Sequence, residues 1–185
     1  AGYGGSCFPK DVKALTKIAR ENGYTAKLIT AVEEVNDAQK LVIVQKIITR
    51  FGEDLTGFTF GIWGLAFKPG TDDMREAPSI YVIKELVNRG AKIKAYDPKA
   101  IDEAKEHYLK GVQNINYVTS KYDVLKGSDA LVLLTEWKEF RSPNFVKIKV
   151  QLKTPIIFDG RNQYDVFRIH EKGFEYYQIG KKSEF

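Results

Sequence analysis

Cys7 is the residue of this sequence whose type and surroundings point most directly to chemistry. It is the only cysteine among 185 residues, and Gly2, Gly4 and Gly5 precede it. Glycines let a ligand approach the backbone closely and permit positive φ angles. Pro9, two residues later, is typical of the first turn of a helix, and the start of a helix favours a thiolate over a thiol. Cys7 is therefore a candidate nucleophile.

Two charged residues follow the cysteine at positions that suit this role. Lys10 adds positive charge, which also favours the thiolate. Asp11 comes four residues after Cys7, one helical turn away on the same face, where a carboxylate can steer a water molecule or accept a proton. A nucleophile beside an acid fits covalent acyl chemistry. The alternative is that Cys7 is a small, buried, apolar side chain without a chemical role.

A long polar loop at residues 66–78 follows an apolar, strand-like segment. Ligands of open α/β sheets bind at the carboxyl ends of strands, and loops there often carry function. Lys68 and Arg75 in this loop, with Arg161 after a later apolar segment, can form an anion-binding rim whose natural ligand is a diphosphate. The alternative is a solvated loop with internal ion pairs. The other polar residues of the loop are Thr71, Asp72, Asp73 and Glu76.

A dinucleotide-binding unit is a further hypothesis for residues 61–97. Gly61 and Gly64 end one strand-like segment, and Asp97 ends the next, about where such units hold a ribose-binding acid. The spacing is GxxG rather than GxGxxG, so the glycine that lets the helix approach the strand is missing. Asp97 stands before Pro98, and we favour a turn residue at the strand end over a ribose ligand.

The elements that position these residues follow from the apolar pattern. Apolar residues spaced by three and four over residues 11–50 mark one buried stripe, which Asn22-Gly23 interrupts. This predicts a short helix, a turn, and a long helix from about Thr25 to Phe51. After Gly52, strands and helices alternate, which predicts an α/β fold with a Rossmann-like, mainly parallel sheet and helices on both faces. The predicted strands lie near residues 58–65, 91–96, 130–134, 155–158 and 176–179, the predicted helices near residues 79–89 and 100–109, and residues 181–185 are predicted to be a frayed end.

Composition narrows the possible partners. The net charge of +5 arises from 29 Lys and Arg against 24 Asp and Glu, spread along the chain rather than gathered in one run. This balance attracts anionic ligands, but without a nucleic-acid-binding motif it predicts no nucleic-acid partner. No apolar run approaches the roughly 18 residues of a membrane span, and no signal peptide is evident, so we expect a cytoplasmic protein. A single cysteine cannot form an internal disulfide, and we predict no metal site.

Three motifs of this sequence closely resemble the UDP-glucose 6-dehydrogenase family. The first is Gly4-Gly5-Ser6-Cys7-Phe8-Pro9-Lys10-Asp11, the second is Trp63-Gly64-Leu65-Ala66-Phe67-Lys68-Pro69 with residues 71–79, and the third is Asp159-Gly-Arg-Asn162. They occur in the family's order and span nearly the whole chain, so together they are a far more specific signal than any single glycine pattern.

The resemblance implies an NAD-dependent enzyme that oxidises UDP-glucose to UDP-glucuronate in two steps. Cys7 matches the family's nucleophile, which forms a thiohemiacetal and then a thioester, and Asp11 matches the aspartate that assists hydrolysis of the thioester. Relatives that oxidise GDP-mannose usually have Leu after the cysteine, and those for UDP-N-acetylmannosamine depart from Pro-Lys-Asp, so Phe8 and residues 9–11 favour UDP-glucose. The matched substrate-binding residues are Gly2, Tyr3, Gly4, Phe67, Lys68 and Arg161, and those on the side of NAD are Lys10 and Arg75.

The same resemblance implies a division of the chain. Residues 1–52 match the end of the central helical region, with the catalytic cysteine and a long connecting helix, and residues 53–185 match the C-terminal UDP-sugar-binding domain. In the family the long helix lies at a dimer interface, which implies a homodimer. The family's N-terminal NAD-binding domain has no counterpart among these residues, so we expect weak or no turnover from them alone. The alternatives are a non-catalytic UDP-sugar-binding or dimerisation module, and a dehydrogenase of GDP-mannose or another nucleotide sugar.

Overall fold

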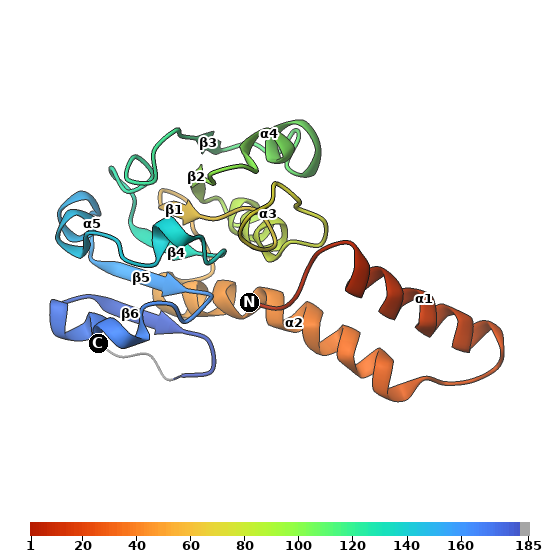
Figure 1. Ribbon diagram of the computed structural model, residues 1–185. Coiled ribbons are helices and arrows are strands. Elements are labelled where there is room, and N and C mark those ends of the chain that lie inside the picture. The colour runs from red at the N-terminus through yellow and green to blue at the C-terminus, as the bar shows by residue number, and fades with distance from the viewer. Residues whose placement is uncertain (182–185) are drawn as a thin grey trace.

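Two helices form a hairpin that projects from an α/β sheet in the computed structural model, which describes residues 1–181 (Figure 1). The helices are α1, Cys7–Glu21, and α2, Lys27–Phe51. Thr16 donates a hydrogen bond of 2.9 Å to Glu33 across the hairpin. The predicted short helix, turn and long helix are confirmed, and α1 begins at Cys7 itself.

The sheet has six parallel strands in the order β3-β2-β1-β4-β5-β6. Apolar runs that are buried throughout, such as those of β4 and β5, are typical of parallel strands covered on both faces. The strand order reverses between β1 and β4, so a crevice at the carboxyl ends of these two strands is the expected ligand site. The strands are β1 Thr59–Trp63, β2 Lys92–Tyr96, β3 Ile115–Tyr117, β4 Ala130–Leu133, β5 Ile156–Asp159 and β6 Glu175–Gln178.

Helices cover both faces of this sheet. The chain passes from β1 to β2 in one direction and from β4 to β5 in the other, so right-handed crossovers place α3 and α5 on opposite faces. The second half of α2 packs beside α3. The predicted Rossmann-like fold is confirmed. The connecting helices are α3 Pro78–Asn88, α4 Ile101–Glu103, which continues as a π-helical turn Ala104–Tyr108, and α5 Phe145–Gln151, with 3-10 turns at Lys138–Phe140, Asp165–Phe167 and Ile169–Lys172.

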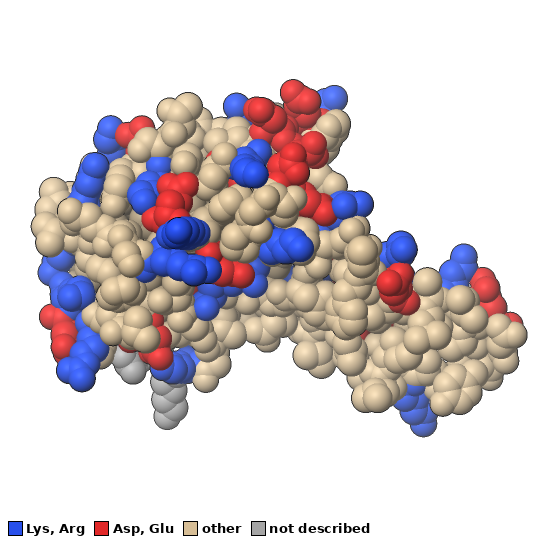
Figure 2. Space-filling model, in the orientation of Figure 1, with Lys and Arg blue, Asp and Glu red and all other residues tan. Residues whose placement is uncertain are grey.

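The apolar stripe of α2 is buried along only half of its length. Ile43 and Ile47 have no exposed surface, whereas Leu28 is 80% exposed and Val35 is 67% exposed. The prediction of one continuous buried stripe is therefore wrong for the first half of the helix. The reason is that this half lies beyond the sheet, where α1 and residues 2–3 pack against it, and Figure 2 shows that end of the hairpin as mostly uncharged surface.

Two sequence predictions concern the ends and surface of the molecule. The predicted frayed end, residues 181–185, lies outside the described residues except for Lys181. Within residues 1–181, no helix is both long enough and apolar enough to cross a membrane.

Candidate functional site

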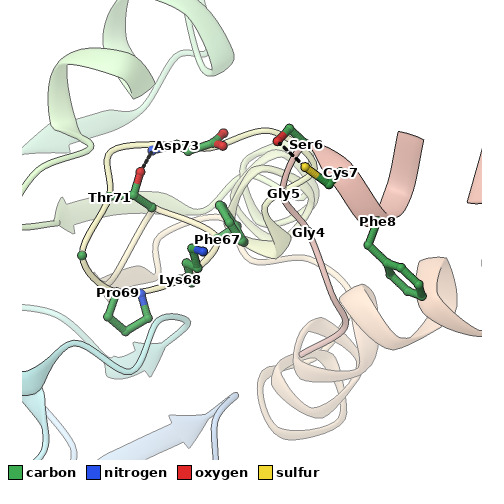
Figure 3. Close-up of a pocket in the computed structure, with 11 residues that line it drawn as sticks. Gly4, Gly5, Ser6, Cys7, Phe8, Phe67, Lys68, Pro69, Thr71 and Asp73 are labelled. Atoms are coloured by element: carbon green, nitrogen blue, oxygen red, sulfur yellow. Dashed lines mark hydrogen bonds between the residues drawn. The ribbon is translucent and has the colours of Figure 1, made fainter. Parts of the chain in front are cut away.

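Cys7 opens onto a cleft of about 690 Å³, called here the Cys7 cleft. One wall is the backbone of residues 4–8, and the opposite wall is the loop after β1, which contributes Phe67, Lys68 and Asp73 (Figure 3). The thiol is exposed, and its Sγ atom lies 3.6 Å from the Oγ atom of Ser6. The alternative that Cys7 is a buried apolar residue is wrong, because the side chain is exposed at the boundary of open space in the single chain.

A second cleft of about 610 Å³ lies on the other side of the same cysteine and is called here the basic cleft. Its charged lining residues are Lys10, Lys13, Arg75 and Glu76. Three cations against one carboxylate favour an anionic ligand. Cys7 borders both clefts, so a group bound in either one can approach the sulfur.

The glycines before Cys7 let the backbone pass close to its neighbours. The N–H of Gly5 donates to the carbonyl oxygen of Arg75 at 2.7 Å, and Gly5 has a φ angle of 95°, in the left-handed region. A methyl group on Gly4 would lie 2.5 Å from the carbonyl oxygen of Glu76. Gly4 and Gly5 are therefore packed tightly against the loop after β1. This packing is a second reason for glycine at these positions, beside the ligand access that the sequence predicts.

Gly2, Tyr3 and Asp11, which the sequence predicts as site residues, lie outside the lining of the two clefts. Gly2 and Tyr3 lie against α2 in an apolar groove of about 470 Å³, and neither is among the residues that line the Cys7 cleft. Asp11 lies one turn after Cys7 on α1 and pairs with Lys10 at 3.2 Å, with 66% of its side chain exposed. It is absent from the lining of both clefts.

Asp97, at the carboxyl end of β2, is a buried structural acceptor. Its Oδ2 atom accepts hydrogen bonds from the backbone N–H groups of Leu65 and Ala66 at 2.7 and 3.1 Å and from the Trp137 indole at 3.0 Å. Its Oδ1 atom accepts from the N–H groups of Lys99 and Ala100, both at 2.9 Å. The preference for a turn residue is confirmed, and the carboxylate pins the start of the loop that carries Phe67 and Lys68.

The glycines of the GxxG pattern have a packing role as well. Gly64 has a φ angle of 93°, and a methyl group there would lie 2.4 Å from the Cβ atom of Thr135. A methyl group on Gly61 would lie 2.7 Å from the carbonyl oxygen of Val124. Both positions require glycine because neighbouring backbone comes close, which accounts for the pattern without a dinucleotide.

Arg161 joins three loops at the carboxyl ends of the strands. Its Nε atom donates to the carbonyl oxygen of Leu134 at 2.7 Å, and its Nη2 atom donates to that of Phe67 at 3.3 Å. Glu136 pairs with the same guanidinium at 3.1 Å. The predicted position at the strand ends is confirmed, although Arg161 does not line the Cys7 cleft.

Asp159, at the end of β5, holds the turn that carries Arg161. It accepts hydrogen bonds from the N–H groups of Arg161 and Tyr164, both at 2.9 Å, and from the hydroxyl of Tyr176 at 2.8 Å. Burial raises the pKa of Asp159, and these hydrogen bonds oppose the rise without cancelling it. Asp97 and Asp159 thus anchor the two loops whose basic residues the sequence singles out.

Arg75 faces the basic cleft but also has a partner in its own loop. Its Nε and Nη2 atoms donate to Asp73 at 2.9 and 2.7 Å. The hydrogen bond from Arg75 lowers the pKa of Asp73. The loop therefore contains the internal ion pair that the alternative proposed, and Lys68 remains exposed with its Nζ atom 5.1 Å from the centre of the Phe67 ring.

The sequence does not predict Asn36 and Lys40 as site residues, yet both contact the site. Asn36 accepts a hydrogen bond of 2.7 Å from the N–H of Tyr3, and Lys40 donates to Glu76 at 3.0 Å. They occupy the same face of α2 as the buried Ile43 and Ile47. A polar residue at a buried position of a helix is the signal that could have identified them.

Comparison with known proteins relates both parts of the chain to one family. Residues 61–166 match the UDP-binding domain of the UDP-glucose/GDP-mannose dehydrogenase family, and residues 1–38 match its central domain. The chain is 44% identical over 182 residues to UDP-glucose 6-dehydrogenase of Pseudomonas aeruginosa, and 44% identical over 180 residues to UDP-glucose 6-dehydrogenase TuaD of Bacillus subtilis. Each match covers 97% of this chain, and the chain spans 40% and 38% of the length of these curated relatives.

A solved structure agrees with this result. The chain is similar to a UDP-glucose dehydrogenase from the archaeon Pyrobaculum islandicum, with 31% sequence identity and a TM-score of 0.75. That match covers 86% of this chain and 34% of the archaeal one.

Proposed function

Because the chain belongs to the UDP-glucose/GDP-mannose dehydrogenase family, we propose that it is the part of a UDP-glucose 6-dehydrogenase that holds the catalytic cysteine and binds the UDP-sugar. Residues 1–52 are assigned to the end of the central region, with the long connecting helix. Residues 53–185 are assigned to the UDP-sugar-binding domain. The observation that carries the proposal is the exposed Cys7 at the boundary of two clefts.

The proposed reaction is the oxidation of UDP-glucose to UDP-glucuronate at C6, with two NAD molecules consumed. When bound, NAD would supply the oxidising chemistry for both steps as a hydride acceptor. Lys10 and Arg75 are assigned to the side of NAD, and their place in the basic cleft, together with Lys13, suits the diphosphate of such a cofactor.

Cys7 is assigned the covalent step. Its sulfur, as the thiolate, adds to the aldehyde carbon: the carbon–sulfur bond forms as the π bond of the carbonyl opens, and the oxygen takes a proton from solvent to complete a thiohemiacetal. After the second oxidation has converted this into a thioester, a water oxygen attacks the same carbon, and the carbon–sulfur bond breaks to release the carboxylate and the thiolate. Asp11, one turn along α1, is assigned to orient that water and accept its proton.

The substrate residues are assigned to the walls around the Cys7 cleft. Gly4, Phe67 and Lys68 line it, and the ammonium of Lys68 can neutralise a developing oxyanion or a phosphate. Arg161 is assigned to the substrate through its position between the loops after β1, β4 and β5. Gly2 and Tyr3 are assigned to the substrate as part of the segment that leads to Gly4; the Tyr3 ring packs on Phe8, which lines the Cys7 cleft, with 4.7 Å between the ring centres.

A homodimer through the long helix is part of the proposal. The groove that Tyr3 shares with Leu28, Val32 and Val35 is apolar, and these three α2 side chains are exposed in the single chain. Burial of apolar surface of this kind favours association. Sedimentation of the chain and of Val35→Glu tests this: we expect a dimer for the first and a monomer for the second, and two monomers would refute the dimer.

Alkylation of Cys7 by iodoacetamide, followed by mass spectrometry, tests the proposed function. We expect UDP-glucose to bind the chain by calorimetry and to slow alkylation by about tenfold or more, because the sugar in the Cys7 cleft covers the thiol. GDP-mannose should protect less. The chain alone should form little NADH from UDP-glucose and NAD, and Cys7→Ala should form none. Binding without protection would favour a non-catalytic UDP-sugar module, stronger protection by GDP-mannose would favour a GDP-mannose enzyme, and failure to bind any uridine nucleotide would reject both UDP-sugar roles.

A further inference from the structure

We propose that Glu76 is a positioning residue whose carboxylate holds the segment carrying Cys7 at the boundary of the two clefts. The inference rests on the proposed function, because it concerns how the reacting sulfur is held. It extends that function to a carboxylate that lines the basic cleft but has no role in the proposed reaction.

Three helices meet at this one carboxylate. The Oε1 atom of Glu76 accepts a hydrogen bond of 2.7 Å from Lys13 of α1. The Oε2 atom accepts from Lys40 of α2 at 3.0 Å and from the Tyr81 hydroxyl of α3 at 2.6 Å. Because α1 begins at Cys7, the bond from Lys13 ties the helix of the nucleophile directly to the loop after β1.

The burial of Lys40 makes this cluster more than a surface ion pair. Its side chain is 2% exposed, and its Nζ atom lies 4.2 Å from the centre of the Tyr81 ring. A buried ammonium needs a partner, and Asp37 provides a second one at 3.1 Å. Burial raises the pKa of Glu76, but the hydrogen bonds from Lys13, Tyr81 and Lys40 outweigh it and lower the pKa to about 2. The carboxylate therefore keeps its charge throughout the neutral range.

The backbone of Glu76 transmits this restraint to the N-terminal segment. Glu76 has a φ angle of 54°, in the left-handed region that a non-glycine residue adopts only at a cost. The three side-chain hydrogen bonds offset that cost. Gly4 packs on the carbonyl group of Glu76, and Gly5 donates to the neighbouring carbonyl of Arg75. Holding the turn at Glu76 therefore holds the two residues that lead into Ser6 and Cys7.

This arrangement predicts that a change at Glu76 affects the protection of the Cys7 thiol by UDP-glucose without affecting the affinity of the chain for UDP. Arg161, the guanidinium assigned to the substrate, is held by the carbonyl oxygens of Leu134 and Phe67 rather than by Glu76. We therefore expect the affinity for UDP to depend little on the Glu76 carboxylate. The position of Cys7 relative to the sugar does depend on it. A displacement of about 1 Å is enough to lower the reactivity of a positioned group by up to about a hundredfold.

The experiment compares three variants of the chain. Glu76→Gln removes the charge while keeping the shape of the side chain. Lys13→Gln removes the link to α1, from a side chain that is 55% exposed, together with one cation of the basic cleft, so all three variants are compared without NAD. Glu175→Gln is the matched control, because Glu175 accepts two hydrogen bonds from Arg50, at 2.6 and 2.9 Å, between α2 and β6. For each variant, UDP affinity, protection of Cys7 from alkylation by UDP-glucose, and hydrogen exchange of the Gly5 amide are measured.

We expect the Gly5 amide to exchange about tenfold faster in Glu76→Gln, and the protection by UDP-glucose to fall about tenfold, with UDP affinity unchanged within about threefold. In Lys13→Gln, exchange of the Gly5 amide should be at least threefold faster and protection of Cys7 at least threefold weaker than in the unmodified chain. Glu175→Gln should match the unmodified chain in both measurements. Exchange and alkylation of Glu76→Gln equal to those of Glu175→Gln would overturn the inference. If the unmodified chain binds no UDP-glucose, the proposed function fails, while the Gly5 exchange still decides whether Glu76 holds this segment.

Discussion

Replacement of Asp97 by Asn separates the two roles that the sequence allows for this residue. The substitution keeps the shape of the side chain but turns one acceptor oxygen into an NH₂ donor. Asp97 is 2% exposed, and its two oxygens receive five hydrogen bonds from residues after β1, β2 and β4. Whichever oxygen becomes the amide nitrogen, at least two N–H groups then face another donor.

The magnitude follows from these contacts. If the amide nitrogen replaces Oδ1, the N–H groups of Lys99 and Ala100 lose their acceptor. A buried donor left without a partner costs about 1–3 kcal/mol, so the loss of two acceptor contacts should lower the free energy of unfolding by about 2–6 kcal/mol. That is a large part of the stability of an ordinary domain, about 5–15 kcal/mol.

Urea unfolding followed by tryptophan fluorescence measures this loss, because Trp63 and Trp137 both lie in the sheet domain. Asp123→Asn is the control: Asp123 pairs with Lys126 at 2.6 Å on the surface, and its loss should cost less than about 0.5 kcal/mol. A change below about 1 kcal/mol for Asp97→Asn would refute the reasoning. A loss of NAD affinity at unchanged stability would instead support the ribose-binding role.

Three further predictions concern the anchors of the site. Arg161→Lys loses the fork that joins two loop carbonyls, so calorimetry should show affinity for UDP-glucose falling about tenfold, with a stability loss below about 1 kcal/mol; unchanged affinity would contradict the assignment. Gly64→Ala should destabilise by about 3 kcal/mol in urea, because the new methyl group collides with Thr135, whereas Gly23→Ala, with a φ of 74° and open space around it, should cost about 1 kcal/mol; equal losses would contradict the crowding argument. The pKa of Glu76 is lowered from 4.5 to about 2, so its contribution to stability is present above pH 4.5 and disappears as the pH falls toward 2. Between pH 4.5 and pH 2 the free energy of unfolding of the unmodified chain should fall by about 1–2 kcal/mol more than that of Glu76→Gln, after allowance for solvent screening. Parallel curves of unfolding free energy against pH would show that the charge of Glu76 adds no stability.

Local pattern was sufficient for most of the elements but failed in two instructive places. Residues 146–151 alternate apolar and polar side chains, a pattern that favours a strand, yet they belong to α5. This helix is capped by a hydrogen bond of 2.9 Å from the Lys147 N–H to Asn144. Only Ile148 of this helix is buried. Strand β3 is three residues long and only half-buried, so it has too short an apolar pattern to stand out.

The sequence by itself determined the motifs, the helix that begins beside Cys7, and the alternation of strands and helices, because these depend on residues near one another in the chain. Only the tertiary structure decided which groups meet at the site. Glu76 joins Lys13 and Lys40 across 63 and 36 residues, and Arg161 reaches Phe67 across 94. Hydrogen bonds of this kind depend on how α1, α2 and the strand ends pack against one another, and no local spacing encodes that arrangement. The same packing decided that both carboxylate oxygens of Asp97 accept hydrogen bonds within the protein. It also decided that half of the apolar stripe of α2 is exposed in the single chain.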